Sequence, residues 1–173
     1  MPPISPMVFV VATVGAFVLL FFYRLLGGLF FVEGDGGTRH EPGQRMRVLE
    51  ANQLAAEFYA RALGGADAVA GRQFLDGRGF TREHADHFGI GFAPRGGHEL
   101  RDFLLAKKLT KDDLVKAGLV RESGWDFFQG RLVWPIRDAG RSTLGFGARR
   151  LFDDDRMPAK YLNTPETLVY KKS

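Results

Sequence analysis

The chain has 173 residues, which is enough for about one domain. Hydrophobic residues make up 45% of it and charged residues 25%, so most of the chain is able to bury a core, and a wholly disordered protein is excluded. The formal charge of +4 suits an anionic partner without identifying it, and the lack of cysteine excludes disulfides, thiol chemistry and cysteine-ligated zinc.

Residues 1–32 are strongly hydrophobic. The stretch MVFVVATVGAFVLLFFY at 7–23 carries no charge, and a helix of that length is about long enough to cross a hydrocarbon core. We therefore predict a transmembrane helix within residues 7–32; a buried core helix and a start read in the wrong frame stay open as alternatives. Four arginines follow before residue 48, so the positive-inside rule places the rest of the chain in the cytoplasm.

Residues 33–45 are rich in glycine and predict a linker, and an ordinary soluble domain follows over 46–173. Apolar residues at helical spacing predict short helices, which cover 46–63, 67–76, a segment capped by Thr81, 100–106 and 110–118. Thr110 and Asp113 resemble a capping box. The stretch GIGFAP at 89–94 is expected to be a glycine-broken connection, and Thr164-Pro165-Glu166 has the residue types of a helix start.

Two strands close the pattern. GRLVWPIRD at 130–138 and STLGFGARRLF at 142–152 are rich in β-branched and aromatic residues and flank an Ala-Gly turn, which predicts a β-hairpin. Pro135 lacks an N–H group and is expected at an edge or a bulge. The predicted fold is therefore α+β, with small helical segments followed by a short antiparallel hairpin or sheet.

The second predicted strand combines glycines, which have no side chain, with arginines. Gly145 and Gly147 lie two residues apart, hence on one face, and Arg149 continues that face. We expect such a face to let another backbone come close, and arginine suits phosphate because its planar fork donates two parallel hydrogen bonds. Arg131 and Arg137 alternate on the first strand, without a register that relates them to Arg149. The alternative is that these arginines are solvated or pair with carboxylates such as Asp126, Asp138 and Asp153.

Several motifs in order resemble those of the bacterial DnaG-type DNA primases, as found in actinobacteria. They are the helix EANQLAAEFYARAL, RGFTREHADHFGIGFAP at 78–94, GRLVWPIRD, GFGARR and PAKYLNTPET. The resemblance runs from about Glu33 to Ser173. It implies the amino-terminal subdomain of the RNA polymerase core of a primase, whose basic track holds the template strand and the RNA–DNA hybrid.

The resemblance also implies nucleic-acid or nucleotide contacts at matching positions. The family's basic residues fall on Arg78, Arg149 and Lys160, with Arg137 and Arg131 as further candidates. Two departures stand out. An arginine-rich D-R-F-R-x-R stretch of many relatives reads Asp126-Phe127-Phe128-Gln129-Gly130-Arg131 here, and a common tryptophan is replaced by Gly97. Fewer phosphate contacts would weaken binding.

The resemblance further implies parts that this sequence lacks. A zinc ribbon needs cysteine, and the magnesium-holding acidic residues of the TOPRIM subdomain would follow Ser173. We therefore expect magnesium and zinc only for the full-length family, predict no catalytic or metal-binding residue in this chain, and expect it to make no primers by itself. Asp153, Asp154 and Asp155 are interpreted as a solvated loop, because consecutive side chains point in different directions.

Three hypotheses follow. The chain is a fragment of a DNA primase, a membrane-anchored and inactive nucleic-acid-binding module, or the product of a truncated or frameshifted gene. The expected partners are a single-stranded DNA template, an RNA–DNA hybrid and nucleotides, while a replicative helicase would bind only through a further domain. The expected location is the cytoplasm or nucleoid, with an anchor through residues 7–32 as the membrane alternative.

Overall fold

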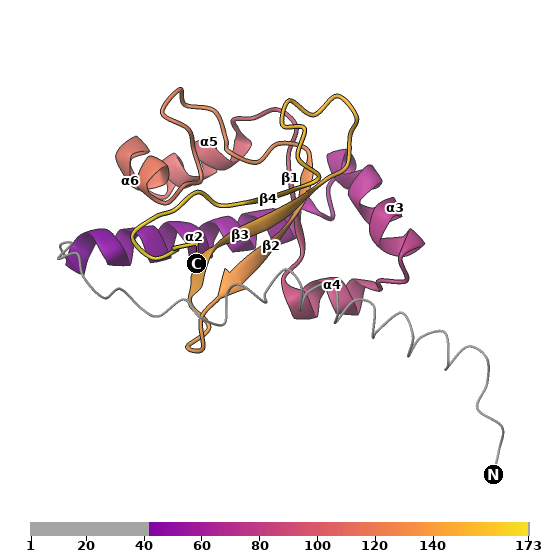
Figure 1. Ribbon diagram of the computed structural model, residues 1–173, viewed down its shortest axis with the longest axis horizontal. Coiled ribbons are helices and arrows are strands. Elements are labelled where there is room, and N and C mark those ends of the chain that lie inside the picture. The colour runs from indigo at the N-terminus through magenta and orange to yellow at the C-terminus, as the bar shows by residue number, and fades with distance from the viewer. Residues whose placement is uncertain (1–41, 173) are drawn as a thin grey trace, which may run out of the picture.

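The structure is a computed structural model that describes residues 42–172 (Figure 1). The predicted transmembrane segment lies outside these residues. Within residues 42–172, no helix is both long and apolar enough to cross a membrane.

The described part is α+β, as predicted. Its helices are α2 (Pro42–Ala62), the 3₁₀ turn η1 (Ala66–Ala68), α3 (Val69–Gly77), α4 (Arg82–Phe88), α5 (Glu99–Ala106) and α6 (Lys111–Lys116). Its strands are β1 (Gly91–Ala93), β2 (Arg131–Arg137), β3 (Thr143–Arg150) and β4 (Tyr161–Asn163), which form one antiparallel sheet in the order β1-β2-β3-β4. The predicted helices and hairpin are thus confirmed.

Helices cover both faces of the sheet (Figure 1). On one face, α2 packs on the strands and contacts α5 and α6, and the main core includes Tyr59, Leu104, Val133 and Phe146. On the other face, α3 and α4 cover a second cluster that includes Leu75, Ala85, Leu132 and Trp134. Neighbouring residues of β2 therefore belong to different clusters, because side chains alternate across a strand.

The segment at 89–94 holds a strand, where the sequence led us to expect only a connection. Gly91 pairs with Val133 of β2, and a Cβ atom at Gly91 would lie 2.4 Å from the Tyr59 carbonyl carbon of α2. Only glycine lets the helix backbone approach this closely. Tyr59 is 1% exposed and meets the Phe146 ring edge-on at 5.2 Å. The strand therefore exists because a long-range neighbour pins it, which local spacing does not reveal.

Pro135, which has no N–H group to donate to a neighbouring strand, lies beyond the part of β2 that pairs with β1. It pairs with Phe146 of β3 on one side, while β1 reaches only the segment Arg131–Val133 on the other. The register then shifts between Ile136 and Arg137. The missing N–H group of Pro135 therefore costs no hydrogen bond to β1.

The predicted N-caps are confirmed, and one predicted helix start is wrong. The hydroxyls of Thr81 and Thr110 accept from the backbone N–H groups of His84 and Asp113, closing two capping boxes. At Thr164 no helix begins within the described residues. Its buried hydroxyl instead accepts from the backbone N–H of Phe146 at 2.7 Å. The hydroxyl that the sequence predicts as a helix cap therefore bonds to strand β3.

Asp126 caps a helix that begins far from it in sequence. Its carboxylate accepts from the backbone N–H groups of Leu100, at 3.1 Å, and Arg101, at 3.0 Å, in the first turn of α5. The side chain of His98, the residue at the N-cap position, makes no capping hydrogen bond to the helix backbone. Burial raises the pKa of Asp126 to about 6, and the two N–H donors offset part of that effect. Asp126 is therefore a structural cap and no partner for the strand arginines.

We expect the stability of the protein to depend on pH through the titration of Asp126. The folded carboxyl keeps its proton up to about pH 6, whereas the ordinary aspartate value is 3.8. The free energy of unfolding should therefore fall by up to about 3 kcal/mol as the pH rises from 4 to 7, relative to Asp126→Asn, which has no such titration. Urea unfolding of both proteins across this range measures the difference. Parallel profiles would contradict it.

Candidate nucleic-acid interface

Two predicted site residues, Arg78 and Arg149, meet on one aromatic ring. Arg78 follows the last residue of α3, and its guanidinium carbon lies 4.6 Å from the centroid of the Phe74 ring. The guanidinium carbon of Arg149, from β3, lies 4.3 Å from the same centroid. The two charges can therefore be no farther apart than the sum of these distances. We call Phe74, Arg78 and Arg149 the arginine platform.

No carboxylate among residues 42–172 pairs with Arg78 or Arg149. Arg149 also donates from Nη1 to the carbonyl oxygen of Arg150, while its Nε atom is buried without a hydrogen-bond acceptor. Both charges thus stay uncompensated by an acid in the described part of the chain, which is the condition for attracting a polyanion.

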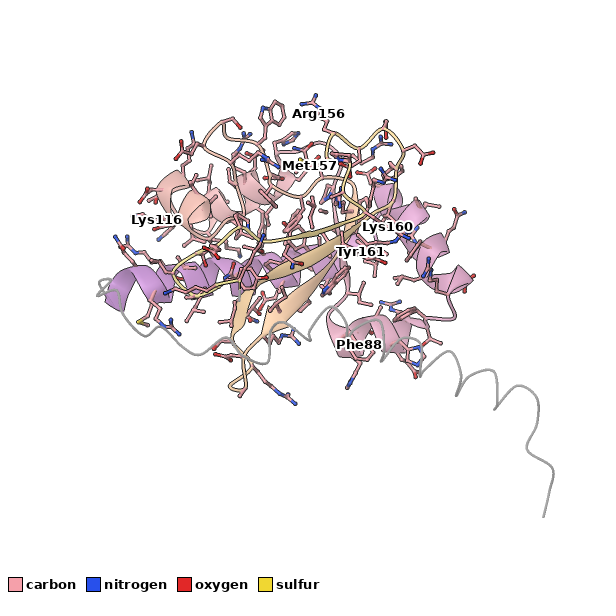
Figure 2. The ribbon with its side chains drawn as sticks, viewed as in Figure 1. Phe88, Lys116, Arg156, Met157, Lys160 and Tyr161 are labelled. Atoms are coloured by element: carbon pink, nitrogen blue, oxygen red, sulfur yellow. The ribbon has the colours of Figure 1, made fainter. Side chains whose placement is uncertain are left out.

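Lys160 lies at the same end of the sheet. It comes one residue before β4, whose Tyr161 pairs with Arg149, and its carbonyl oxygen accepts from the backbone N–H of Arg150 at 2.9 Å. Its exposed ammonium lies 5.9 Å from the centroid of the Tyr161 ring (Figure 2). Lys160 is thus a neighbour of the end of β3 that carries Arg149, which precedes it by 11 residues in the sequence. Arg78 lies 71 residues before Arg149 and reaches it only through the fold.

Arg137 is not part of this group. It is exposed at the far end of β2, where it pairs with Thr143, whereas Arg149 lies opposite Leu132. Five residues of strand separate Leu132 from Arg137, a distance of about 17 Å. The structure therefore places Arg137 at the opposite end of the strand from the partner of Arg149, with its guanidinium beside Gly89.

Arg131 is buried, which corrects its assignment as a candidate contact. Its side chain is 1% exposed, and its Nε atom donates to the Asp155 carboxylate at 2.9 Å. Its Nη2 atom donates to the carbonyl oxygens of Met157 and Ala159, both at 2.8 Å. This guanidinium holds the loop at 153–159 against the sheet, and its Nη1 atom is buried without a hydrogen-bond partner.

The glycine positions of β3 are filled, which corrects a second expectation. A Cβ atom at Gly147 would lie 2.3 Å from the indole nitrogen of Trp134, and one at Gly145 would lie 3.0 Å from Thr164. Both glycines are buried. They make room for side chains of the protein itself and offer no open track to another molecule.

Sequence reasoning missed a groove of about 460 Å³ beside the loop at 153–159. Four arginines, two aspartates and several aromatic rings line it, and we call it the tryptophan groove. Its lining includes Arg95, Arg121, Trp125, Phe127, Phe152 and Arg156. Trp125 is 50% exposed, and Arg156 lies at the outer edge of the loop (Figure 2). The exposed tryptophan in GWDFFQG is the one local signal that could have indicated the groove.

The tryptophan groove joins segments that are far apart in sequence. The Arg95 guanidinium carbon lies 4.0 Å from the centroid of the Phe152 ring, and its Nη2 atom lies 2.6 Å from the Asp154 carboxylate. Gly97, at a φ of +78°, would bring a Cβ atom to 3.0 Å from the Trp125 ring. Gly97 therefore lies directly against the Trp125 ring.

The three consecutive aspartates do not converge. Asp154 pairs with Arg95 and Asp155 with Arg131, so they face different partners. Within the described residues, no three side chains of the metal-ligating types gather in one place. The structure therefore gives no donor set that fits a magnesium or zinc ion in this part of the chain.

Comparisons with known proteins agree on one family. The sequence matches the DNA primase catalytic core, N-terminal domain, over residues 58–173. The DNA primase of Streptomyces coelicolor is 46% identical over 149 residues, which are 84% of this chain and 23% of that protein. The chain thus spans less than a quarter of the length of this curated relative.

Solved structures of similar chains contain DNA. The RNA polymerase domain of the Mycobacterium tuberculosis primase DnaG in complex with double-stranded DNA gives a TM-score of 0.71 at 51% identity, covering 73% of this chain and 41% of that chain. A DnaG primase catalytic domain bound to single-stranded DNA gives a TM-score of 0.67 at 32% identity, covering 75% of this chain and 40% of that chain.

We expect Arg131 to contribute strongly to the free energy of unfolding. Arg131→Met should lower the free energy of unfolding by about 3–5 kcal/mol, because it leaves the buried Asp155 carboxylate without its cation. The double variant Arg131→Met with Asp155→Asn should recover part of the loss. The exposed Arg156 in the same loop is the matched control, and Arg156→Met should cost less than about 0.5 kcal/mol. Urea unfolding measures all three; equal effects at 131 and 156 would contradict the assignment.

Proposed function

Because the chain belongs to the family of the DNA primase catalytic core, N-terminal domain, we propose that it contributes the nucleic-acid-binding part of a primase, the enzyme that makes primers for DNA replication. Its proposed ligands are the single-stranded template, the RNA–DNA hybrid and the incoming nucleotide. The observation that carries this proposal is the arginine platform beside the exposed Lys160, with both platform charges unpaired by any described carboxylate.

The chemistry of these residues suits a phosphate backbone. A guanidinium donates parallel hydrogen bonds to phosphate oxygens, and a lysine ammonium adds a mobile point charge. Such contacts position a strand without reading its sequence. We therefore propose a contact that holds template or hybrid by charge, with sequence preference left to other parts of the enzyme.

The tryptophan groove supplies the complementary chemistry. An exposed indole next to cationic side chains is a stacking surface for an unpaired base, and stacking tolerates every base because each has a π-face. The relatives with bound DNA support a nucleic-acid partner for this fold. Since Phe127 and Gln129 stand where many relatives have arginine, we propose that stacking at Trp125 contributes more here than phosphate contacts do.

The proposed role includes no chemistry by the described residues themselves. Metal-assisted nucleotidyl transfer needs carboxylates that hold magnesium against the phosphates. We propose that these belong to the remainder of the longer family proteins, of which this chain spans less than a quarter.

We expect the full chain to bind a fluorescein-labelled oligothymidylate, with an affinity that falls steeply as salt rises. Arg78→Ala, Arg149→Ala and Lys160→Ala should each weaken binding and reduce the slope of log K against log salt by about 0.7, the share of one single-strand phosphate contact. Lys111→Ala is the matched control, since Lys111 is exposed at the start of α6 on the other face of the sheet. Fluorescence anisotropy measures each affinity. If the three variants bind like the Lys111 variant, the interface lies elsewhere.

Trp125→Ala should weaken oligothymidylate binding by about 1–3 kcal/mol while leaving the salt slope unchanged, because stacking releases no counterions. Tryptophan fluorescence gives a second readout. Trp134 is 4% exposed, so quenching on binding should come from Trp125 and disappear in the variant. Quenching that persists without Trp125 would show that the groove is not the stacking site.

A further inference from the structure

We propose that Phe74 is a positioning residue for the phosphate contacts, which it exerts through Arg78 and Arg149. This inference rests on the proposed function, in which these two arginines bind the nucleic-acid backbone. The observation behind it is that both guanidinium carbons lie within 4.6 Å of the centroid of one ring.

A ring holds an arginine in a way that keeps it useful for phosphate. A carboxylate partner would occupy the N–H donors that a phosphate needs and would cancel the charge. Attraction to the face of a ring uses no hydrogen-bond donor and leaves the charge intact. Phe74 therefore restrains two long side chains without removing the properties that attract a polyanion.

The ring also opposes the mutual repulsion of the two cations. Two like charges this close disfavour each other, and without an attractive surface their flexible side chains would separate into solvent. Each guanidinium gains separately from the negative face of the ring. The phosphate chain then finds two charges already gathered, and less side-chain freedom is lost on binding.

The ring itself is held by the fold. Phe74 is half-buried and packs against the second cluster, which contains Leu75, Leu132 and Trp134. Arg78 comes from the end of α3, and Gly79 reverses the chain directly after it at a φ of +77°. Arg149 comes from β3. Phe74 is therefore the point at which a helix end and a strand present their charges together.

A second ring in the same molecule provides an internal control. Phe103 of α5 is also half-buried and also carries two cations, since the Arg61 guanidinium carbon and the Lys107 ammonium lie 5.2 Å and 5.4 Å from its centroid. It belongs with the main core on the other face of the sheet. Substituting Phe103 removes the same kind of interaction away from the proposed interface.

The test compares Phe74→Leu, Phe74→Tyr and Phe103→Leu in the full chain, with fluorescein-labelled oligothymidylate as the probe. Phe74→Leu should weaken binding about five- to thirtyfold, the range that two exposed cation–π contacts represent. Phe74→Tyr keeps the ring and should restore parent affinity. Phe103→Leu should leave affinity unchanged, and urea unfolding should show that both leucine variants remain folded.

A double-mutant cycle separates positioning from general structure. When Arg78→Ala and Arg149→Ala are already present, Phe74→Leu should cause no further loss of affinity, because its effect passes through those arginines. An undiminished loss in that background overturns the inference. So does parent-like affinity of Phe74→Leu in a protein that responds to Arg78→Ala and Arg149→Ala, and this outcome leaves the proposed function intact. If the arginine variants themselves bind like the parent, the proposed function fails, and the role of Phe74 fails with it.

Discussion

The proposed interface depends on the bonds that the buried guanidinium of Arg131 makes to the loop at 153–159. Its guanidinium, on the first residue of β2, binds Asp155 and the carbonyl oxygens of Met157 and Ala159. These bonds fix the loop that leads from β3 into β4, and hence the position of Lys160 and one wall of the tryptophan groove. Removing one partner of a buried ion pair is strongly destabilising, because the other partner is left as an unpaired charge away from water. The loop therefore has a defined place although it contains no helix or strand.

The arginines of this chain divide by what surrounds them. Arg131 is buried and bound to Asp155 and two carbonyl oxygens, Arg137 is exposed at the far end of its strand, and Arg78 and Arg149 rest on an aromatic ring. Of these four arginines, Arg78 and Arg149 combine restraint with a charge that no described carboxylate neutralises. Membership of the primase family gives these residues a context, and two solved relatives are complexes with DNA. Local environment, more than residue type, separates structural arginines from those suited to phosphate.

Much of the fold could be predicted from local sequence. The caps at Thr81 and Thr110 depend on residues three positions away, and the β2–β3 hairpin depends on two neighbouring strands and a short turn. The strand at 91–93 could not be predicted, since it requires the α2 backbone to approach Gly91. The role of Thr164 could not be predicted either, because its hydroxyl accepts a hydrogen bond from β3 and does not cap a helix. In both cases a distant segment competes with the local preference and prevails.

The sequence by itself determined the family, the α+β class and the identity of the basic positions, because these depend on residue types and their order along the chain. Only the tertiary structure decided which charges are available. Spacing treats Arg131 and Arg149 alike, yet the fold buries one against Asp155 and lays the other on Phe74, 75 residues earlier in the chain. Likewise, two glycines that looked like an open track turned out to be filled by Trp134 and Thr164. Burial and partnership are properties of segments brought together in space, so they appear only when the chain is folded.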